Sequence, residues 1–294
     1  MLTLEGVSKI HKVGTFGSKQ LVAVQDVTFA VRPGEVVSLI GESGAGKSTI
    51  GKMVLRLEAP SRGAISFDGM NVATLERGAL KRYYRRVQGV FQDPFSSYNP
   101  IFKADRVFAM VKDAFYPRMA RSEWQGRLEE SMRAVSLNPG DCLHKYPHQL
   151  SGGQLQRLLI ARALLLDIEL LVADEIISML DASTRIDVLN LLGDLKARGL
   201  AVLFITHDLS LGNYISDRTV ILRRGRIVEM GVNDKVFGNP RHPYTKMLLD
   251  SVPQLTHKWS SDEYARNGNG SPYDVYGELV EVEADHYVAV ETSR

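Results

Sequence analysis

The segment from Gly41 to Thr49 has the residue types and the spacing that bind phosphate groups. It reads G-E-S-G-A-G-K-S-T, which fits the pattern G-x-x-x-x-G-K-[ST]. Its glycines permit a tight turn that brings backbone N–H groups close to an anion, Lys47 can reach the β and γ phosphates, and Ser48 can ligate Mg²⁺. We therefore expect a site for a nucleoside triphosphate. It consists of Gly41, Glu42, Ser43, Gly44, Ala45, Gly46, Lys47, Ser48 and Thr49.

Two carboxylates, Asp174 and Glu175, follow the apolar run 170–173. That run is typical of a buried parallel strand, and open α/β sheets bind ligands at the carboxyl ends of their strands. Asp174 is placed to hold Mg²⁺ through water, and Glu175 to orient or deprotonate an attacking water. Because side chains alternate along a strand, we expect the two carboxylates to point in different directions. Without a phosphate loop, an acidic pair capping the next helix would be the better reading.

Two further polar residues follow strand-like runs. His207 comes after the apolar run 201–205, where it can hydrogen-bond a γ-phosphate and sense its presence. Gln92 follows 89–91 and opens a polar loop bounded by Pro94 and Pro100. Its amide is an uncharged ligand for Mg²⁺ or water, and it can swing away when the loop moves.

The pentapeptide 150–154, L-S-G-G-Q, lies between Gln92 and the acidic pair. On its own it reads as a helix N-terminus. In this order after a phosphate loop, it instead predicts that two copies of such a domain close over ATP and split it. The residues concerned are Ser151, Gly152, Gly153 and Gln154.

These residues require a small set of elements to position them. The runs 36–40, 170–173 and 201–205 predict buried strands, and the pattern turns helical from about 47 to 57. Residues 2–32 and 64–69 have the pattern of short strands with turns, including 27–31 and 64–68, which predicts an antiparallel subsheet close to the adenine of a bound nucleotide. Residues 93–157 have mostly helical periodicity. Two hairpins are expected, at 220–230 with its turn at Arg224-Gly225 and at 279–290 around Ala284-Asp285.

With these motifs in this order, the chain resembles the nucleotide-binding subunit of an ATP-binding cassette (ABC) transporter. The resemblance runs from about residue 2 to 290 and matches Walker A at 41–49, a Q-loop at Gln92, the signature at 150–154, Walker B at 170–174, a D-loop at 178–181 and the switch His207. The wordings F-Q-D-P-F-S-S-Y-N-P at 91–100, Y-P-H-Q at 146–149 and N-P-R-H-P-Y-T at 239–245 resemble the oligopeptide/dipeptide importer branch.

The resemblance implies an α/β fold, a P-loop NTPase cassette with a mainly parallel core sheet, an antiparallel β subdomain and a helical subdomain. It implies a nucleotide-binding domain at 1–240, with the helical subdomain at about 93–157, and a C-terminal extension at 241–294. Each ATP would lie between one subunit's Walker A and the other's signature. The family position of the adenine-stacking residue falls on His11, with Phe16 as a competing candidate.

The implied partners are a second, non-identical ABC ATPase, two membrane permeases and an extracytoplasmic solute-binding protein, with ATP and Mg²⁺ as cofactors. The implied location is peripheral, at the cytoplasmic face of the cell membrane. The implied activity is ATP hydrolysis that powers import of oligopeptides, dipeptides or similar solutes. The same role for an oligosaccharide or nickel importer stays open, as does a soluble non-transport ABC ATPase. A P-loop kinase would leave the signature unexplained.

The chain departs from the branch in two places. The family commonly reads D-E-P-T-S-A-L-D, whereas this chain reads D-E-I-I-S-M-L-D at 174–181. Ile176, Ile177 and Met179 are therefore expected to add apolar bulk near the dimer seam. Some members carry cysteines that bind an iron–sulfur cluster, but this chain has one cysteine, Cys142, which excludes a Cys-ligated cluster.

Composition fits these expectations. The chain has 294 residues, 44% of them hydrophobic, which supports a sizeable core, and a net charge of +2, which is too small to indicate nucleic acid. The basic cluster 81–86 predicts a solvated helix face. The start, M-L-T-L-E, has no signal-peptide pattern, and charges interrupt the apolar region 158–180, so membrane attachment is expected through a partner.

Overall fold

The computed structural model describes residues 1–13, 19–251 and 273–291. The chain divides into two compact units. The first unit comprises residues 1–31, 35–73 and 204–294, and the second comprises 32–34 and 74–203. Two further segments lie outside the described residues: the polar, Gly-rich stretch 260–272, whose composition predicts a linker, and the Gly-rich stretch 14–18, which predicts a hairpin.

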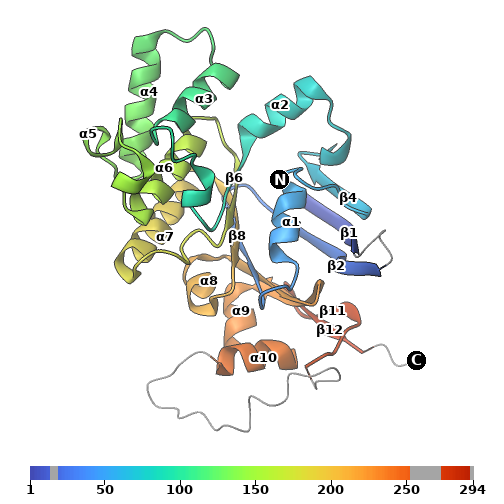
Figure 1. Ribbon diagram of the computed structural model, residues 1–294. Coiled ribbons are helices and arrows are strands. Elements are labelled where there is room, and N and C mark those ends of the chain that lie inside the picture. Colours follow the sequence, from blue (N-terminus) through green and yellow to red (C-terminus); the bar gives the residue numbers. More distant parts are fainter. Residues whose placement is uncertain (14–18, 252–272, 292–294) are drawn as a thin grey trace. The chain divides into compact units, whose positions relative to one another are not determined.

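The first unit contains the antiparallel sheet that the sequence predicted at the N-terminal end (Figure 1). Its strand order is β2-β1-β4-β5, and the pairing of β1 with β2 and with β4 is antiparallel. The strands are β1 (Leu2–Val13), β2 (Lys19–Val31), β4 (Arg62–Phe67) and β5 (Met70–Asn71).

A second group of strands in the first unit carries the phosphate loop. Strand β3 (Val36–Ile40) pairs in parallel with β9 (Arg218–Arg223), and β9 forms a hairpin with β10 (Arg226–Val232). The C-terminal hairpin of β11 (Glu278–Glu283) and β12 (His286–Val290) continues this sheet by pairing β12 with β10. Both predicted hairpins are therefore confirmed, and Arg224, Gly225 and Asp285 have the positive φ that such turns require.

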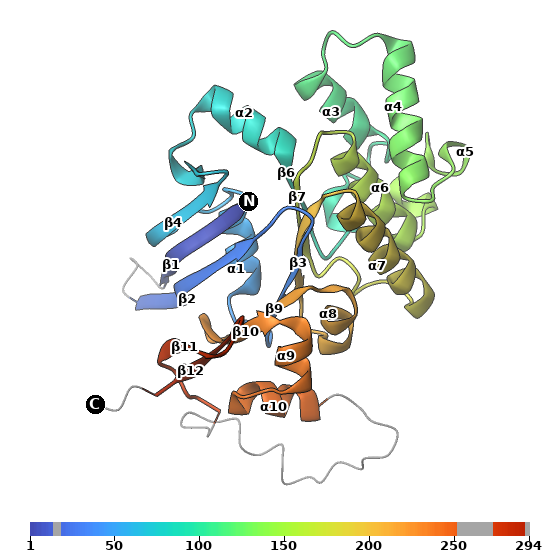
Figure 2. The same ribbon diagram turned by 180° about the vertical axis from the view of Figure 1, so that it is seen from behind.

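The helices of the first unit lie next to these strands. They are α1 (Lys47–Val54), the 3₁₀ helix η2 (Val72–Thr74, whose last residue opens the second unit), α8 (Leu209–Ile215), α9 (Asn233–Gly238) and α10 (Pro243–Asp250). In Figure 2, α9 and α10 lie beside β10, β11 and β12.

Helix α1 is shorter than the expected span of 47–57. After Val54 the chain turns at Arg56, whose φ of 53° is left-handed. The N–H of Leu57 then bonds to the carbonyl of Lys52, and that of Arg56 to the carbonyl of Met53. This is a Schellman motif, in which the last carbonyls of a helix are satisfied from beyond its end. Sequence periodicity gives no sign of it because Arg rarely adopts this conformation.

The second unit is mostly helical, as predicted for 93–157. Its parallel strands are β6 (Val87–Val90) and β7 (Leu170–Asp174), and strand β8 (Ala201–Thr206) leads from it into the first unit. Its helices are α2 (Arg77–Arg86), η3 (Phe95–Ser97), α3 (Arg106–Phe115), α4 (Arg121–Ala134), α5 (Pro139–Cys142), η4 (Pro147–Gln149), α6 (Gly152–Leu164) and α7 (Ala182–Ala197).

The apolar strands form the core of each unit. Every residue of β3 and of β7 is buried, which confirms the prediction made from their continuous apolar runs. Around them, the parallel strand pairs, the antiparallel sheet and the helical segment confirm the α/β cassette fold class. No helix in the described part of the chain combines the length and the apolar character needed to cross a membrane.

Candidate functional site

The phosphate loop leaves the carboxyl end of β3 and enters α1, so it has the strand–loop–helix setting that the motif requires. Two of its glycines are needed because other backbone comes very close. A Cβ on Gly41 would lie 2.1 Å from the carbonyl oxygen of Leu222 in β9. Gly46 has a φ of 100°, and a Cβ there would lie 2.4 Å from the carbonyl oxygen of Ala23 in β2.

The β9–β10 turn is hydrogen-bonded to the phosphate loop. The N–H of Gly225 donates to the carbonyl of Ala45 at 2.9 Å, and its own carbonyl accepts from the N–H of Gln25 at 2.7 Å. The loop backbone is therefore held between the turn and strand β2. Such a fixed backbone can present its N–H groups to an anion without first having to be ordered.

Lys47 folds back into the loop. Its ammonium group donates to the carbonyl of Gly41 at 2.7 Å and to the carbonyl of Glu42 at 2.9 Å, and the residue is 4% exposed. The preceding Gly46 has no side chain to cap α1, and the first turn of the helix carries no acidic residue. This helix N-terminus, with a lysine beside it, favours an anion. Glu42, Ser43, Gly44 and Ser48 are exposed at the rim, and Thr49 is half-buried.

His207 also belongs to the first unit, directly after β8. Its side chain is exposed, whereas the next residue, Asp208, caps α8 by accepting from the N–H of Leu211 at 3.1 Å. The capped helix and the buried strand hold the backbone on both sides of His207. The exposed imidazole therefore does not pack in the core.

The acidic pair lies in the second unit. Asp174 ends β7 and is 7% exposed. Glu175 has a φ of 50°, so the chain leaves the extended conformation there. We expected the two carboxylates to point in different directions because side chains alternate along a strand. That reason does not apply, because Glu175 already belongs to a turn. Its carbonyl accepts from the N–H of Ser178 at 3.1 Å, which closes that turn.

The signature residues form the N-terminus of α6, which is 13 residues long. Ser151 and Gln154 make a capping box. The Ser151 hydroxyl accepts from the N–H of Gln154 at 3.2 Å, and the Gln154 side-chain oxygen accepts from the N–H of Ser151 at 2.9 Å. Gly152 and Gly153 follow the cap. A Cβ on Gly153 would lie 2.8 Å from Cγ2 of Thr184, so glycine allows α6 to approach α7 closely.

Gln92 is exposed and begins a loop that is tied to α6. The hydroxyl of Tyr98 donates to the carbonyl of Leu155 at 3.0 Å. The amide of Gln156, which is fully buried, donates to the carbonyl of Phe91 at 3.4 Å. Phe95, half exposed, lies close enough to Gly152 that a Cβ there would be 3.8 Å from its ring. The residues on both sides of Gln92 thus contact the signature helix.

Asp181 is a helix cap that the motif alone did not reveal. Its carboxylate accepts from the Ser183 hydroxyl at 2.6 Å, the Thr184 N–H at 3.0 Å and the Thr184 hydroxyl at 2.8 Å. These hydrogen bonds hold the pKa of the Asp181 carboxyl well below its ordinary value. The sequence does carry a signal for this cap, because Asp is a favoured N-cap residue and Asp181 directly precedes a helical segment.

The isoleucines at 176 and 177 do not add apolar surface. Ile176 is 1% exposed and Ile177 is 2% exposed, so the expectation that they add apolar bulk near a dimer seam is wrong. Both side chains are packed in the core, as large aliphatic side chains usually are. Met179, at 61% exposure, is the residue of this segment that presents apolar surface.

Other predicted residues have more modest settings. The ring of His11 in β1 lies 3.8 Å from the carboxylate of Glu58, which Lys9 and Lys52 also approach at 3.7 and 3.9 Å. Its stacking on adenine stays a prediction, and Phe16 lies outside the described residues.

Cys142 is buried and free, and burial raises the pKa of its thiol. In the basic cluster, Arg85 and Arg86 form ion pairs with Asp167 and Glu169.

Each unit therefore brings together part of the predicted set. The first unit holds the phosphate loop, His207 and His11, and the second holds Gln92, the signature, Asp174 and Glu175. Sequence reasoning missed Tyr244, which contacts the phosphate loop from α10 through a hydrogen bond to Glu42. Its only trace in the sequence is its place in the wording 239–245.

Comparison with known proteins shows which family the chain belongs to. Residues 24–178 match the family described as ABC transporter, and residues 228–275 match the oligopeptide/dipeptide transporter C-terminal region. The chain is 41% identical over 254 residues to the oligopeptide transport ATP-binding protein OppF of Bacillus subtilis, covering 86% of this chain and 81% of that one. It is 40% identical over 238 residues to OppF of Streptococcus mutans, covering 81% and 77%.

A solved structure shares the fold. The dimeric, post-hydrolysis structure of the ATP-binding cassette MJ0796 bound to ADP and Pi superimposes with a TM-score of 0.71 at 28% identity, covering 79% of this chain and 99% of that one. The family match spans more than half of the chain, and the OppF relatives are matched over most of their length. The chain therefore belongs to the ABC transporter family, as an ATP-binding ATPase subunit of the oligopeptide/dipeptide transporter branch.

Proposed function

We propose that this chain is the ATP-hydrolysing subunit that powers import of oligopeptides or dipeptides through partner permeases. The observation that carries the proposal is that one chain joins a phosphate loop, built against β3 and the β9–β10 turn, to the C-terminal region of this transporter branch. The named relatives are oligopeptide transport ATP-binding proteins, which supports the choice of peptide as cargo. It would act as a peripheral subunit at the cytoplasmic face of the membrane.

The phosphate loop binds the triphosphate. Backbone N–H groups of the loop and the N-terminus of α1 attract the phosphate oxygens, whereas the N–H of Glu42 stays bonded to the Tyr244 hydroxyl. Lys47 now donates to the carbonyls of Gly41 and Glu42, and it exchanges them for β- and γ-phosphate oxygens when nucleotide enters. His11 would stack on the adenine. His207, exposed after β8, would hydrogen-bond the γ-phosphate and report its presence.

Mg²⁺ fits the donors that the chain offers. The Ser48 hydroxyl, the Gln92 amide oxygen and the Asp174 carboxylate are hard oxygen ligands of the type that Mg²⁺ prefers. When bound, the ion would neutralise charge on the β- and γ-phosphates. Asp174 is nearly buried at the end of β7, which holds its carboxylate in one place. Glu175, in the turn that follows, would orient or deprotonate the attacking water.

The signature would act on the nucleotide of a second ATPase subunit. In this chain Ser151 and Gln154 cap the start of α6, and an incoming phosphate would replace these capping hydrogen bonds at a helix N-terminus, where an anion is favoured. We expect that second subunit to be non-identical. Met179, exposed in the turn that leads to the Asp181 cap, is an apolar contact that could favour a complementary partner over a self-copy.

The loop after Gln92 and the segment to about 157 would dock on the permeases. The exposed large apolar residues there are Phe95 at 50%, Ile101 at 76%, Phe102 at 39%, Met110 at 61% and Tyr146 at 38%. Phe95 lies three positions after Gln92, and the loop is hydrogen-bonded to the signature helix. A permease bound at this surface could therefore respond to changes at the Mg²⁺ ligand and at the signature. Peptide would reach the permeases from an extracytoplasmic solute-binding protein.

Reconstitution tests the proposal. The chain, its paired ATPase and their permeases are placed in vesicles, and uptake of labelled peptides is measured with and without ATP, beside labelled oligosaccharides and Ni²⁺. ATP-dependent peptide uptake supports the proposal. Uptake of sugar or nickel alone would retain the ATPase role and change the cargo. ATP hydrolysis unaffected by permeases or cargo would favour a non-transport ATPase and contradict the proposal.

A further inference from the structure

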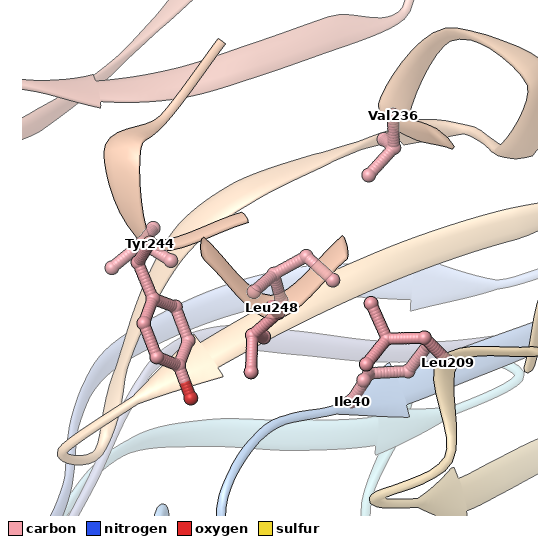
Figure 3. Packing of buried hydrophobic residues seen from close by; sticks show 7 residues of the cluster. Ile40, Leu209, Val236, Tyr244 and Leu248 are labelled. Carbon is pink, nitrogen blue, oxygen red and sulfur yellow. The ribbon is translucent and has the colours of Figure 1, made fainter. Parts of the chain in front are cut away.

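Helix α10, outside the sequence motifs that define the nucleotide site, packs against the elements that carry them. Tyr244 and Leu248 of α10 belong to a buried apolar cluster with Ile40, the last residue of β3, and Leu209, the first residue of α8 (Figure 3). Ile40 directly precedes the phosphate loop, and Leu209 comes two residues after His207. The C-terminal region therefore contacts the strand that leads into the phosphate loop and the helix that follows His207.

Tyr244 makes a polar contact with the loop itself. Its hydroxyl oxygen accepts a hydrogen bond from the backbone N–H of Glu42 at 3.2 Å, across 202 positions of sequence. Tyr244 is fully buried, and burial raises the pKa of its hydroxyl, so it stays neutral. Glu42 is exposed as a residue, yet its peptide groups are held on both sides, because its carbonyl accepts from the Lys47 ammonium group at 2.9 Å.

Arg223 holds the Tyr244 ring in place. Its guanidinium carbon lies 4.4 Å from the centre of the ring, a cation–π contact. The same guanidinium forms an ion pair with Asp274 at 2.8 Å, and both side chains are nearly buried. Asp274 also accepts from the Tyr276 hydroxyl at 3.0 Å and pairs with Arg224 at 2.8 Å. Residues 274 and 276, far beyond the cassette motifs, thus fix a side chain that touches the phosphate loop.

A second buried network anchors the start of α10. Glu229 of β10 accepts from the N–H groups of Arg241 and His242 at 2.8 and 3.0 Å, and its Oε1 lies 2.7 Å from Nε2 of His286 in β12. Glu229, His242 and His286 are all fully buried. The helix that carries Tyr244 therefore has little freedom to move away from the loop.

We propose that Tyr244 is a positioning residue for the phosphate loop, through which the C-terminal region sets the affinity for nucleotide. When Lys47 leaves the carbonyl of Glu42 for the phosphates, the Tyr244 hydroxyl keeps the Glu42 N–H and so the first turn of the loop in place. The inference rests on the proposed binding of ATP at 41–49. It adds a residue of α10 to a site that the sequence motifs confine to the cassette.

Tyr244→Phe tests the inference because it retains the ring, and with it the packing and the contact to Arg223, while removing the hydroxyl. Tyr116→Phe is a matched control. Tyr116 is also buried, also lies under arginines (Arg85 at 4.9 Å and Arg127 at 4.8 Å), and its hydroxyl also bonds to backbone, the carbonyl of Leu165 at 3.2 Å. It belongs to the second unit, outside the phosphate loop.

Two readouts on the full-length chain decide the matter. The first is the dissociation constant for the Mg²⁺ complex of a non-hydrolysable ATP analogue. We expect Tyr244→Phe to weaken it about fivefold, the loss of one hydrogen bond, and Tyr116→Phe to leave it unchanged. The second is hydrogen exchange of the Glu42 amide without nucleotide, which should speed up in Tyr244→Phe alone. In steady-state assays with the partner subunits, KM for ATP should rise more than kcat falls.

Unchanged affinity and unchanged exchange at Glu42 in a folded Tyr244→Phe protein would overturn the inference. Equal weakening in both variants would also overturn it, because a general loss of stability would then be the cause. If the wild-type chain bound no ATP analogue, the proposed nucleotide site itself would fail. That outcome is distinct from binding that simply does not depend on Tyr244.

Discussion

The hydroxyl of Tyr98 donates a hydrogen bond to the backbone carbonyl of Leu155, 3.0 Å away, and so joins the loop after Gln92 to the helix that begins with the signature. Two more bonds act in parallel, from Gln156 to the carbonyl of Phe91 and from Arg162 to the carbonyl of Gly89. Burial raises the pKa of the Tyr98 hydroxyl, so it remains a neutral donor. The loop and α6 are therefore expected to move as one body.

Tyr98→Phe should uncouple this pair. Loss of one buried hydrogen bond should lower the free energy of unfolding by about 1 kcal/mol, measured by urea titration. The stimulation of ATP turnover by the permeases should fall, because a loop that moves independently of α6 passes less of the permease's movement to the signature helix. Stimulation equal to that of the wild type would show that the hydrogen bond carries stability alone.

Gly153→Ala should destabilise the chain although alanine favours helices. The new Cβ would lie 2.8 Å from Cγ2 of Thr184, whose N–H and hydroxyl are both bonded to Asp181. We expect a loss of about 1–3 kcal/mol in unfolding free energy. Gly193→Ala in α7, where a Cβ meets nothing within 4 Å, should instead gain up to about 1 kcal/mol.

The second variant Thr184→Ser isolates the cause. It removes Cγ2 and keeps the hydroxyl that bonds to Asp181. The double variant Gly153→Ala/Thr184→Ser should therefore recover much of the lost stability. If the double variant is no more stable than Gly153→Ala, the contact with Thr184 is not what requires glycine at this position.

His242 should make stability depend on pH. Its Nδ1 accepts from the N–H of Tyr244 at 3.1 Å and its Nε2 faces the carbonyl of Val275 at 3.0 Å, which is the pattern of a neutral ring. Burial, aided by the charge of Arg223, lowers the pKa of His242 in the folded protein. The unfolded chain therefore binds the proton more tightly, and stability present above about pH 6.5 is lost as the pH falls.

The comparison variant is His242→Asn, which can still cap α10 through a side-chain oxygen but does not titrate. The unfolding free energy of the wild type minus that of the variant should shrink between about pH 7.5 and about pH 5.5. Parallel pH profiles for the two proteins would rule out His242 as the titrating group.

Lys47→Ala and Ser151→Ala should impair different ATP sites of the assembled transporter. We propose that Lys47 serves the nucleotide held by this chain and that Ser151 serves the nucleotide of the partner ATPase. Trapping of a labelled nucleotide on each subunit separates the two. We expect Lys47→Ala to abolish trapping on this subunit and Ser151→Ala to reduce it on the other. Loss on the same subunit in both variants would contradict a shared arrangement of sites.

Much of the fold could be predicted from local patterns. The runs at β3 and β7 are apolar throughout because both faces of a parallel strand are buried, and both strands were found where expected. Gly225 and Asp285 mark hairpin turns because Gly and Asp tolerate positive φ, and both turns are confirmed.

What the sequence did not reveal depends on contacts between distant residues. Helix α1 ends early because Arg56 takes a left-handed conformation that its residue type disfavours. The burial of Ile176 and Ile177 follows from the packing around them. A comparison of residues 174–181 with the wording common in the family does not reveal that packing. The contact of Tyr244 with Glu42 joins residues 202 positions apart, and no local pattern encodes such a pair.

The central claim, that this chain hydrolyses ATP with Glu175 as the base, is tested most directly by Glu175→Gln. The substitution keeps size and hydrogen bonding but removes the basic carboxylate. In the assembled transporter, ATP turnover should fall at least about a hundredfold, while ATP binding is retained and a closed ATP-bound dimer accumulates. Glu169→Gln, at an exposed residue paired with Arg86, is the control and should turn over normally. Turnover close to that of the wild type in Glu175→Gln would contradict the account.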